Sequence, residues 1–301
     1  MKQISQSILQ KEYTDHLTGY LRAEDESYAA RICRTAKAIY DSRREKPIVL
    51  LSGPSGSGKT TSARMLEAFL DSWGCETHTI SMDDYFSTMS PEEILLRDAG
   101  KLDLESPNRM DTGLLNEHIL KMIAGEPVEL PEYDFVNSAQ RLSGKILTRK
   151  PGELVIFEGI HALNPSVITV PDSATNRLYV SVRTRIEHEG KLLHPEKIRL
   201  LRRMLRDRVG RGRSPADTLA MYDRVQEGEN KYIMPYKHRC SFDIDTFIGY
   251  EPGVYRAMLW EELEKLREDE RVAEIAEILE SMPPVPPEEV SEKSLIREFI
   301  G

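Results

Sequence analysis

One short segment constrains the fold of this chain more than any other feature. Residues 53–60 read GPSGSGKT and match the phosphate-binding loop pattern GxxxxGK[ST] in full. The segment follows an apolar run at 48–52 that is typical of a buried parallel strand, and it precedes residues with apolar positions at helical spacing. Because the pattern requires a strand before it and a helix after it, the segment predicts an α/β fold with a phosphate site at the carboxyl end of a strand.

The rest of the chain repeats this alternation of strand and helix. Further strand-like runs lie at 77–82, 154–157, 178–182 and 242–247, and amphipathic stretches separate most of them. This order predicts a doubly wound, mainly parallel sheet with helices on both faces. Between residues 133 and 149, two polar-alternating runs flank Ser143 and Gly144, which predicts a β-hairpin insert beside the sheet.

The chain divides into three regions on this reading. Residues 1–45 form an N-terminal helical extension, in which apolar residues recur at helical spacing from 27 to 44. Residues 46–250 form the domain around the phosphate loop. Residues 251–301 form a charged helical region followed by a proline-rich tail, and we expect the tail from Pro283 to be extended and weakly ordered.

Composition and charge exclude several classes of function. The formal net charge of -9 over 301 residues argues against a broad nucleic-acid-binding surface. The three cysteines are widely separated, which argues against a disulfide framework or a zinc site. No run approaches the ~20 apolar residues that span a bilayer, and the first residues lack the apolar core of a signal peptide. We therefore expect a cytoplasmic protein without nucleic-acid or membrane partners.

The phosphate loop predicts nucleotide binding but leaves the reaction open. Lys59 is expected to meet the β and γ phosphates of ATP, and the Thr60 hydroxyl is expected to hold Mg²⁺. The residues expected to hold the ATP phosphates are Gly53, Ser55, Gly56, Ser57, Gly58, Lys59, Thr60 and Thr61. A guanine-reading Asn-Lys-x-Asp motif is missing, because Ile233 stands where its aspartate would be. This argues against a GTPase.

Acidic residues at two strand ends provide candidates for proton transfer and metal binding. Asp83 and Asp84 follow the second strand, where the ligand crevice of such a sheet lies. Asp83 can accept the proton of an acceptor hydroxyl or bind Mg²⁺. Glu158 closes the run at 154–157 and should lie near the phosphate site. The candidate metal ligands are thus Thr60, Glu158 and Asp83.

An arginine-rich segment predicts a lid. The expected helix at 195–209 carries four arginines within about 100° of one face, by 3.6 residues per turn. These are Arg199, Arg202, Arg203 and Arg206. The helix runs into RDRVGRGR, where Gly210 and Gly212 allow hinge motion. Arg206, Arg211 and Arg213 are then expected to clamp the transferring phosphate, as catalytic groups beside Lys59 and Asp83.

Taken together, residues 46–250 resemble the uridine kinase and phosphoribulokinase-like family of P-loop kinases. The motifs occur in the family's order: the phosphate loop, SMDDYF, LESPNRMD, PEYDF, VIFEGI and RDRVGRGR. The phrases FEGIHALN and SLIREFIG look most like a bacterial uridine kinase-like branch. The resemblance implies transfer of phosphate from ATP, with Mg²⁺, to a small-molecule acceptor, most simply a nucleoside 5′-hydroxyl, and it leaves a homo-oligomer open.

The resemblance also implies roles for individual residues. Asp83 matches the catalytic base, and Glu105 stands where uridine kinases carry an aspartate that grips the ribose hydroxyls. Tyr133 matches the tyrosine of the nucleoside pocket, and Arg203 matches an arginine near the substrate. Arg206, Arg211 and Arg213 match lid positions around the phosphates. Arg141 is a further candidate for contact with the acceptor.

The pyrimidine-reading positions depart from the family pattern. Uridine-cytidine kinases place a histidine shortly after YDF, whereas residues 136–141 here read VNSAQR. On an ungapped alignment, Met221 stands where the family has a glutamine. Two alternatives therefore remain open: a kinase of the same fold that acts on another small alcohol or a sugar phosphate, and a nucleotide-binding regulator without an acceptor.

Overall fold

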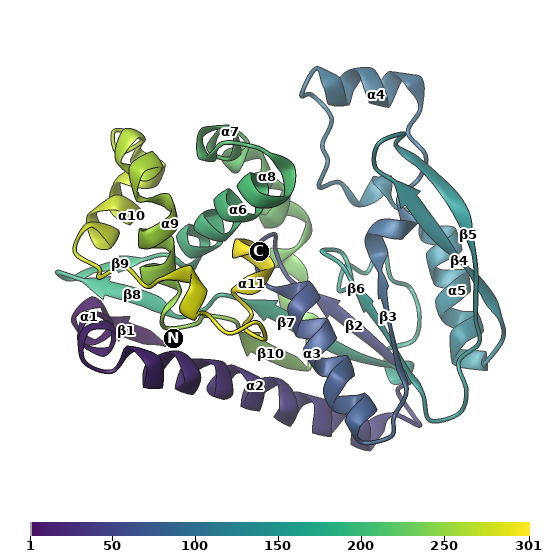
Figure 1. Ribbon diagram of the computed structural model, residues 1–301. Coiled ribbons are helices and arrows are strands. Elements are labelled where there is room, and N and C mark those ends of the chain that lie inside the picture. Colours follow the sequence, from purple (N-terminus) through teal and green to yellow (C-terminus); the bar gives the residue numbers. More distant parts are fainter. Residues whose placement is uncertain (1) are drawn as a thin grey trace.

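The computed structural model describes residues 2–301 and is built around a five-stranded parallel sheet (Figure 1). The strand order is β10-β7-β2-β6-β3. The strands are β2 (Ile48–Ser52), β3 (Thr77–Ser81), β6 (Leu154–Glu158), β7 (Thr175–Ser181) and β10 (Phe242–Asp245). These are the five strands that the apolar runs predict, so the α/β fold with a parallel sheet is confirmed.

The sheet is buried on both faces, which explains why its strands are continuous apolar runs. Side chains alternate along β2: Val49 and Leu51 belong to one core cluster, and Ile48 and Leu50 belong to the other. The first cluster packs against α2 (Leu17–Ser42) and α3 (Lys59–Ser72), and the second packs against α5 (Thr112–Ala124). This is the doubly wound arrangement that the alternation predicts.

The remaining helices surround this core. They are α1 (Gln6–Asp15), α4 (Pro91–Asp98), α6 (Pro195–Arg211), α7 (Pro215–Ala220), α8 (Tyr222–Tyr232), α9 (Glu251–Lys265), α10 (Glu270–Glu280) and α11 (Arg297–Ile300). Short 3₁₀ turns lie at Met82–Tyr85, Pro107–Arg109, Asp172–Ala174, Met234–Arg239 and Pro287–Glu289. A second sheet joins β1 (Gln3–Ser5), β8 (Arg185–His188) and β9 (Lys191–Leu193). The strand β1 pairs with β8, so the N-terminal region is attached to the main domain.

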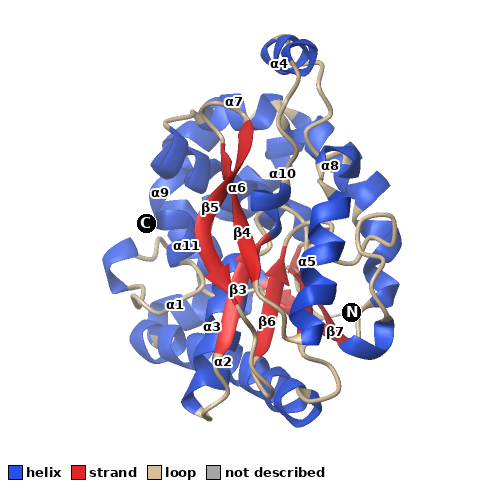
Figure 2. Ribbon diagram, turned by 90° about the vertical axis from the view of Figure 1, so that its right-hand side faces the viewer, coloured by secondary structure: helices blue, strands red, loops and turns tan. Residues whose placement is uncertain are grey.

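The predicted hairpin exists, but the predicted position of its turn is wrong. Its strands are β4 (Val128–Asp134) and β5 (Ala139–Leu147), and it stands beside the β3 edge of the sheet (Figure 2). The turn lies at 135–138, because the Asp134 carboxylate accepts hydrogen bonds from the amides of Val136 and Asn137. Gly144, with φ of +75°, lies within β5, opposite an irregularity between Glu129 and Pro131. Proline cannot donate to the ladder, so the pairing shifts there.

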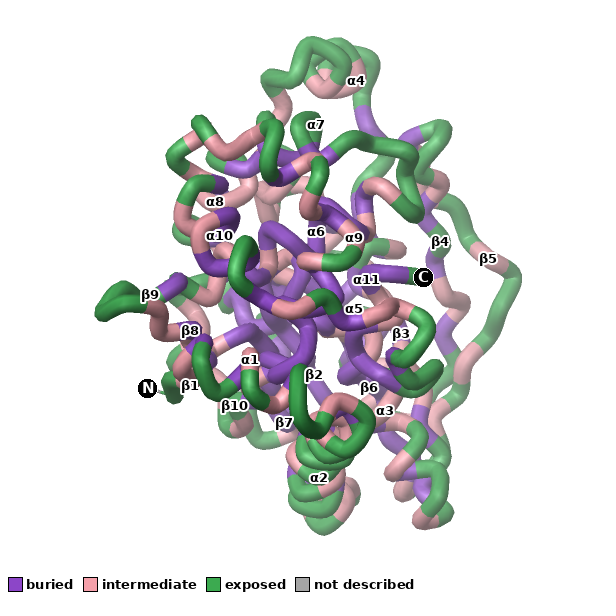
Figure 3. Tube along the Cα trace, turned by 60° about the vertical axis from the view of Figure 1, so that its left-hand side comes forward, coloured by how far each residue is buried: buried purple, intermediate pink, exposed green. Residues whose placement is uncertain are grey.

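The expectation of a weakly ordered tail is also wrong. Val285, Val290, Leu295 and Phe299 are buried in the same core cluster as the central strands. The tail returns to the molecule beside α6, and Figure 3 shows the buried trace close to the C-terminus. Proline prevents a continuous helix but not burial of the apolar residues between the prolines. Within residues 2–301, no helix has the length and apolar character that a membrane span requires.

Candidate active site

A cleft of about 750 Å³ opens where β2, β3 and β6 end. Such a volume accommodates a small-molecule ligand. It is lined by the predicted residues Ser55, Gly56, Ser57, Gly58, Lys59, Thr60, Asp83, Glu105, Tyr133, Glu158, Arg203, Arg206, Arg211 and Arg213. The fold therefore brings most of the candidate residues together, although they come from six separate parts of the chain.

The phosphate loop has the backbone geometry that its glycines permit. Gly56 and Gly58 have φ angles of +73° and +85°, which side chains with a Cβ rarely adopt. Gly58 is the N-cap of α3, so Lys59 and Thr60 begin the helix and its positive end faces the cleft. The Lys59 ammonium donates to the carbonyl of Pro54 at 3.2 Å. The Ser57 hydroxyl is buried and has no hydrogen-bond partner among the described residues.

The three predicted metal ligands line the same cleft. Thr60 Oγ1 donates to Glu158 Oε1 at 3.3 Å, and Asp83 lies in the turn that follows β3. Asp83 is open to the solvent of the cleft on one side, but protein atoms surround it on the others, and the resulting loss of hydration raises its pKa. Burial also raises the pKa of Glu158. Lys59 opposes both shifts. One hydroxyl and two poorly neutralised carboxylates are hard oxygen ligands, so these residues fit Mg²⁺.

Glu105 lines the cleft beside α8. Burial raises its pKa to about 7, and the nearby carboxylate of Glu229 adds to the shift. The close approach depends on Gly228, because a Cβ at this position would lie 2.5 Å from the Cβ of Glu105. No motif around Gly228 in the sequence indicates that it allows Glu105 to approach α8.

An aromatic wall of Phe86, Tyr133 and Phe135 forms another part of the cleft. The ring centroids of Phe86 and Tyr133 are 5.7 Å apart, and those of Tyr133 and Phe135 are 5.0 Å apart. The guanidinium of Arg109 lies 4.8 Å from the centroid of Phe86 and donates to the Tyr133 hydroxyl at 3.4 Å. Arg97 also lines the cleft. The sequence analysis missed Phe86, Phe135, Arg97 and Arg109, although Phe86, Phe135 and Arg109 stand inside its quoted motifs.

The arginines of α6 serve two different purposes. Arg203 and Arg206 line the cleft. Arg202 is fully buried and pairs with Glu251, donating at 2.7 and 3.0 Å. Arg199 pairs with Glu229 at 2.7 Å, and the same carboxylate accepts from the Ser55 amide at 3.1 Å. The four arginines that helical spacing places on one face are thus divided between two environments. Arg203 and Arg206 line the cleft, whereas Arg199 and Arg202 contact carboxylates of other elements.

The predicted lid is more helical than expected. Gly210 lies in the last turn of α6, and Gly212 ends the helix with φ of +63°. Arg211 pairs with Asp207 at 3.0 Å, and Arg213 is exposed beside Met221. Of the two predicted hinge glycines, Gly212 has a left-handed backbone, whereas Gly210 lies within the helix.

Three predicted residues lie outside the residues that line the cleft. Gly53 packs against the carbonyl of Val180. Thr61 lies in the first turn of α3, and its amide donates to Glu298 at 3.0 Å. Arg141 is exposed on β5 and pairs with Glu132 at 3.4 Å.

The chain is similar to known kinases over the region that carries this cleft. The model of the "Phosphoribulokinase / Uridine kinase family" matches residues 48–247. The uridine kinase of Borreliella burgdorferi is 29% identical over 191 residues, which cover 63% of this chain and 82% of the relative. The uridine kinase of Staphylococcus carnosus shows the same identity and coverage. A structure from Bacillus stearothermophilus described as a possible uridine kinase is 16% identical, with a TM-score of 0.46 over 72% of this chain and 98% of the other. With the phosphate loop, the strand-end carboxylates and the α6 arginines in one cleft, the chain belongs to the phosphoribulokinase/uridine kinase family of ATP-dependent P-loop kinases.

Proposed function

We propose that the protein transfers the γ-phosphoryl group of ATP to the 5′-hydroxyl of a nucleoside. The observation that carries the proposal is that a single cleft holds both Lys59 with Asp83 and the aromatic wall of Phe86, Tyr133 and Phe135. Aromatic rings are the usual surfaces on which planar bases stack, and Asp83 lines the same cleft as these rings and the phosphate loop. The uridine kinases among the relatives support the same class of acceptor.

Each group has a role in this reaction. The loop amides and Lys59 hold the phosphates, and Arg206, Arg211 and Arg213 stabilise charge on the transferring oxygens. Asp83 orients the acceptor hydroxyl and takes its proton, and its raised pKa makes it a stronger base than a free aspartate. Glu105 and Arg203 contact the sugar. Mg²⁺, held by Thr60, Glu158 and Asp83, supplies further neutralisation of phosphate charge when it is bound.

A second acceptor class is favoured by a specific observation. Arg97 and Arg109 line the cleft, and no histidine occurs at 136–141. Two guanidinium groups beside the acceptor suit a phosphate group better than an uncharged pyrimidine. The alternative is therefore a kinase of a sugar phosphate or another small alcohol. A regulator that binds nucleotide without an acceptor would bind ATP but release no ADP on addition of any acceptor.

The experiment is a substrate panel with purified protein, ATP and Mg²⁺. Nucleosides, sugar phosphates and simple polyols are tested for acceptor-dependent ADP release, and the phosphorylated product is then identified. Asp83→Asn is the matched control, because it keeps the shape of the side chain but cannot accept a proton, and turnover should fall by about 10²- to 10⁴-fold. Product formation with sugar phosphates alone would overturn the nucleoside proposal.

A further inference from the structure

The C-terminal tail reaches the phosphate loop and places a carboxylate on one of its amides. Glu298, in α11, accepts a hydrogen bond from the backbone amide of Thr61 at 3.0 Å. Thr61 is the third residue of α3, so this amide has no partner within the helix and carries the positive end of its dipole. Glu298 also lines the cleft that contains Lys59. The Glu298 carboxylate thus accepts a hydrogen bond from an amide that is expected to bind a phosphate of the nucleotide.

The segment that carries Glu298 is firmly held. Leu295 lies against Gly58, where a Cβ would come within 2.6 Å of the leucine side chain. The Arg202 guanidinium lies 5.0 Å from the ring centroid of Phe299, and Ile296 is fully buried. The Ser294 hydroxyl contacts the hydroxyl of Tyr250 at 2.5 Å. Because several apolar side chains would be exposed if the tail lifted, the tail backbone should stay in place while ligands enter.

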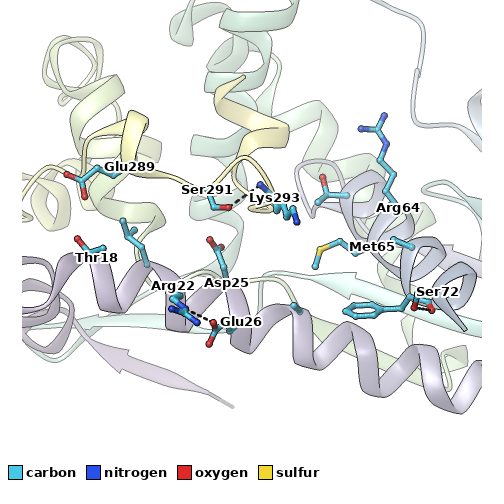
Figure 4. A pocket seen from close by; sticks show the side chains of 15 residues that line it. Thr18, Arg22, Asp25, Glu26, Arg64, Met65, Ser72, Glu289, Ser291 and Lys293 are labelled. Carbon is cyan, nitrogen blue, oxygen red and sulfur yellow. Dashed lines mark hydrogen bonds and ion pairs between the residues drawn. The ribbon is translucent and has the colours of Figure 1, made fainter.

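The Glu298 side chain is less tightly packed than the neighbouring tail residues that hold the segment in place. It is only partly buried, and it borders the open cleft. On the other side of the tail, α2, α3 and the tail residues Glu289, Ser291 and Lys293 line a groove of about 990 Å³ (Figure 4). Thr61 contributes to this groove, and its amide is bonded to Glu298, which lines the cleft. Rotation of the Glu298 side chain away from α3 would break this hydrogen bond and free the Thr61 amide without movement of the tail backbone.

We propose that Glu298 is an autoinhibitory carboxylate, which a nucleotide phosphate must displace from the Thr61 amide. The inference rests on the nucleotide site of the proposed function, but not on the identity of the acceptor. The negative charge of Glu298 acts in two ways: it competes for the amide, and it adds to the negative potential that Glu158 already creates in the cleft. The tail thereby lowers the affinity of the resting enzyme for nucleotide.

The test measures ADP affinity by calorimetry in the absence of any acceptor, for the parent chain and for Glu298→Gln. The glutamine keeps the size of the side chain and removes its charge. Because hydrogen bonds to charged groups contribute about 1.5–3 kcal/mol, of which a neutral amide retains part, ADP should bind the variant about tenfold more tightly. The matched control is Glu292→Gln, which removes a tail carboxylate that is 90% exposed and should change the Kd less than twofold.

Three results would count against the inference. Equal or weaker ADP binding by Glu298→Gln would show that the carboxylate does not compete with nucleotide. An equal gain in Glu292→Gln would show a general effect of net charge. Failure of both the parent chain and Glu298→Gln to bind ADP would remove the nucleotide site and this inference together. Tight ADP binding with no product in the acceptor panel would instead reject only the proposed acceptor. Thermal melting of both variants checks that their folds are intact.

Discussion

Replacement of Arg202 by methionine should destabilise the protein rather than act on phosphate binding. Arg202 and Glu251 are both fully buried, and Arg202 also donates to the carbonyl of Thr246 at 2.7 Å and to that of Gly56 at 3.2 Å. Methionine fills a similar volume but leaves the Glu251 carboxylate without its partner. Breaking a buried pair from one side costs about 3–5 kcal/mol in the free energy of unfolding.

This destabilisation is large enough to measure by urea unfolding. At about 2–4 °C per kcal/mol, the melting temperature should fall by roughly 6–20 °C. The control is Arg208→Met on the same helix, where the arginine is 31% exposed and pairs with Glu262 at 3.1 Å; its loss should cost about 0–1 kcal/mol. In the Arg202→Met background, Glu251→Gln should recover part of the stability, because it removes the unpaired charge. An unfolding free energy within 1 kcal/mol of the parent for Arg202→Met would refute the reasoning.

Three further predictions concern the cleft. Lys59→Ala should lower turnover by about 10²-fold or more with an unchanged circular dichroism spectrum, since a methyl group cannot balance phosphate charge, and near-normal turnover would exclude this lysine from the mechanism. Because burial raises the pKa of Glu105 to about 7, the native state holds this proton more tightly than the unfolded chain. The resulting stability is complete below the ordinary glutamate pKa and is lost as the pH rises through about 7. Relative to Glu105→Gln, the parent should therefore lose unfolding free energy between about pH 4.5 and about 7 in urea titrations and change little above this range, and parallel curves would contradict the shift. Arg211→Ala combined with Arg213→Ala should reduce acceptor-dependent turnover more than ADP affinity, measured on the same preparations; unchanged turnover would mean that both arginines are merely solvated.

Features carried by neighbouring residues were predictable. The strand β2 and the phosphate loop are adjacent in sequence, and the glycines, Lys59 and Thr60 make their chemistry explicit. Asp83 and Glu158 could be placed in the cleft because each follows a strand, and parallel strands end at one edge of the sheet.

The misplaced hairpin turn shows where local patterns mislead. Ser143 and Gly144 are common turn residues, but Asp134 caps a turn nearer the start of the segment. The Asp134–Asn137 spacing was a local signal and could have been used. The order of the tail was harder to predict from the sequence. Its prolines and charged residues suggested disorder, and the surface that buries its apolar residues forms only in the folded molecule.

The parallel sheet, the phosphate loop and the acids at the strand ends could be predicted, because each depends on residues that are neighbours in the sequence or on the common edge of a sheet. Which arginines of α6 face the cleft depends on contacts made in the folded molecule, because Arg202 pairs with Glu251 and Arg199 pairs with Glu229. The contact of Glu298 with Thr61, 237 residues earlier in the chain, also forms only on folding. Such partners are determined by packing between distant segments. Helical spacing predicts which residues share a face of the helix, but it does not predict which side chains that face will contact.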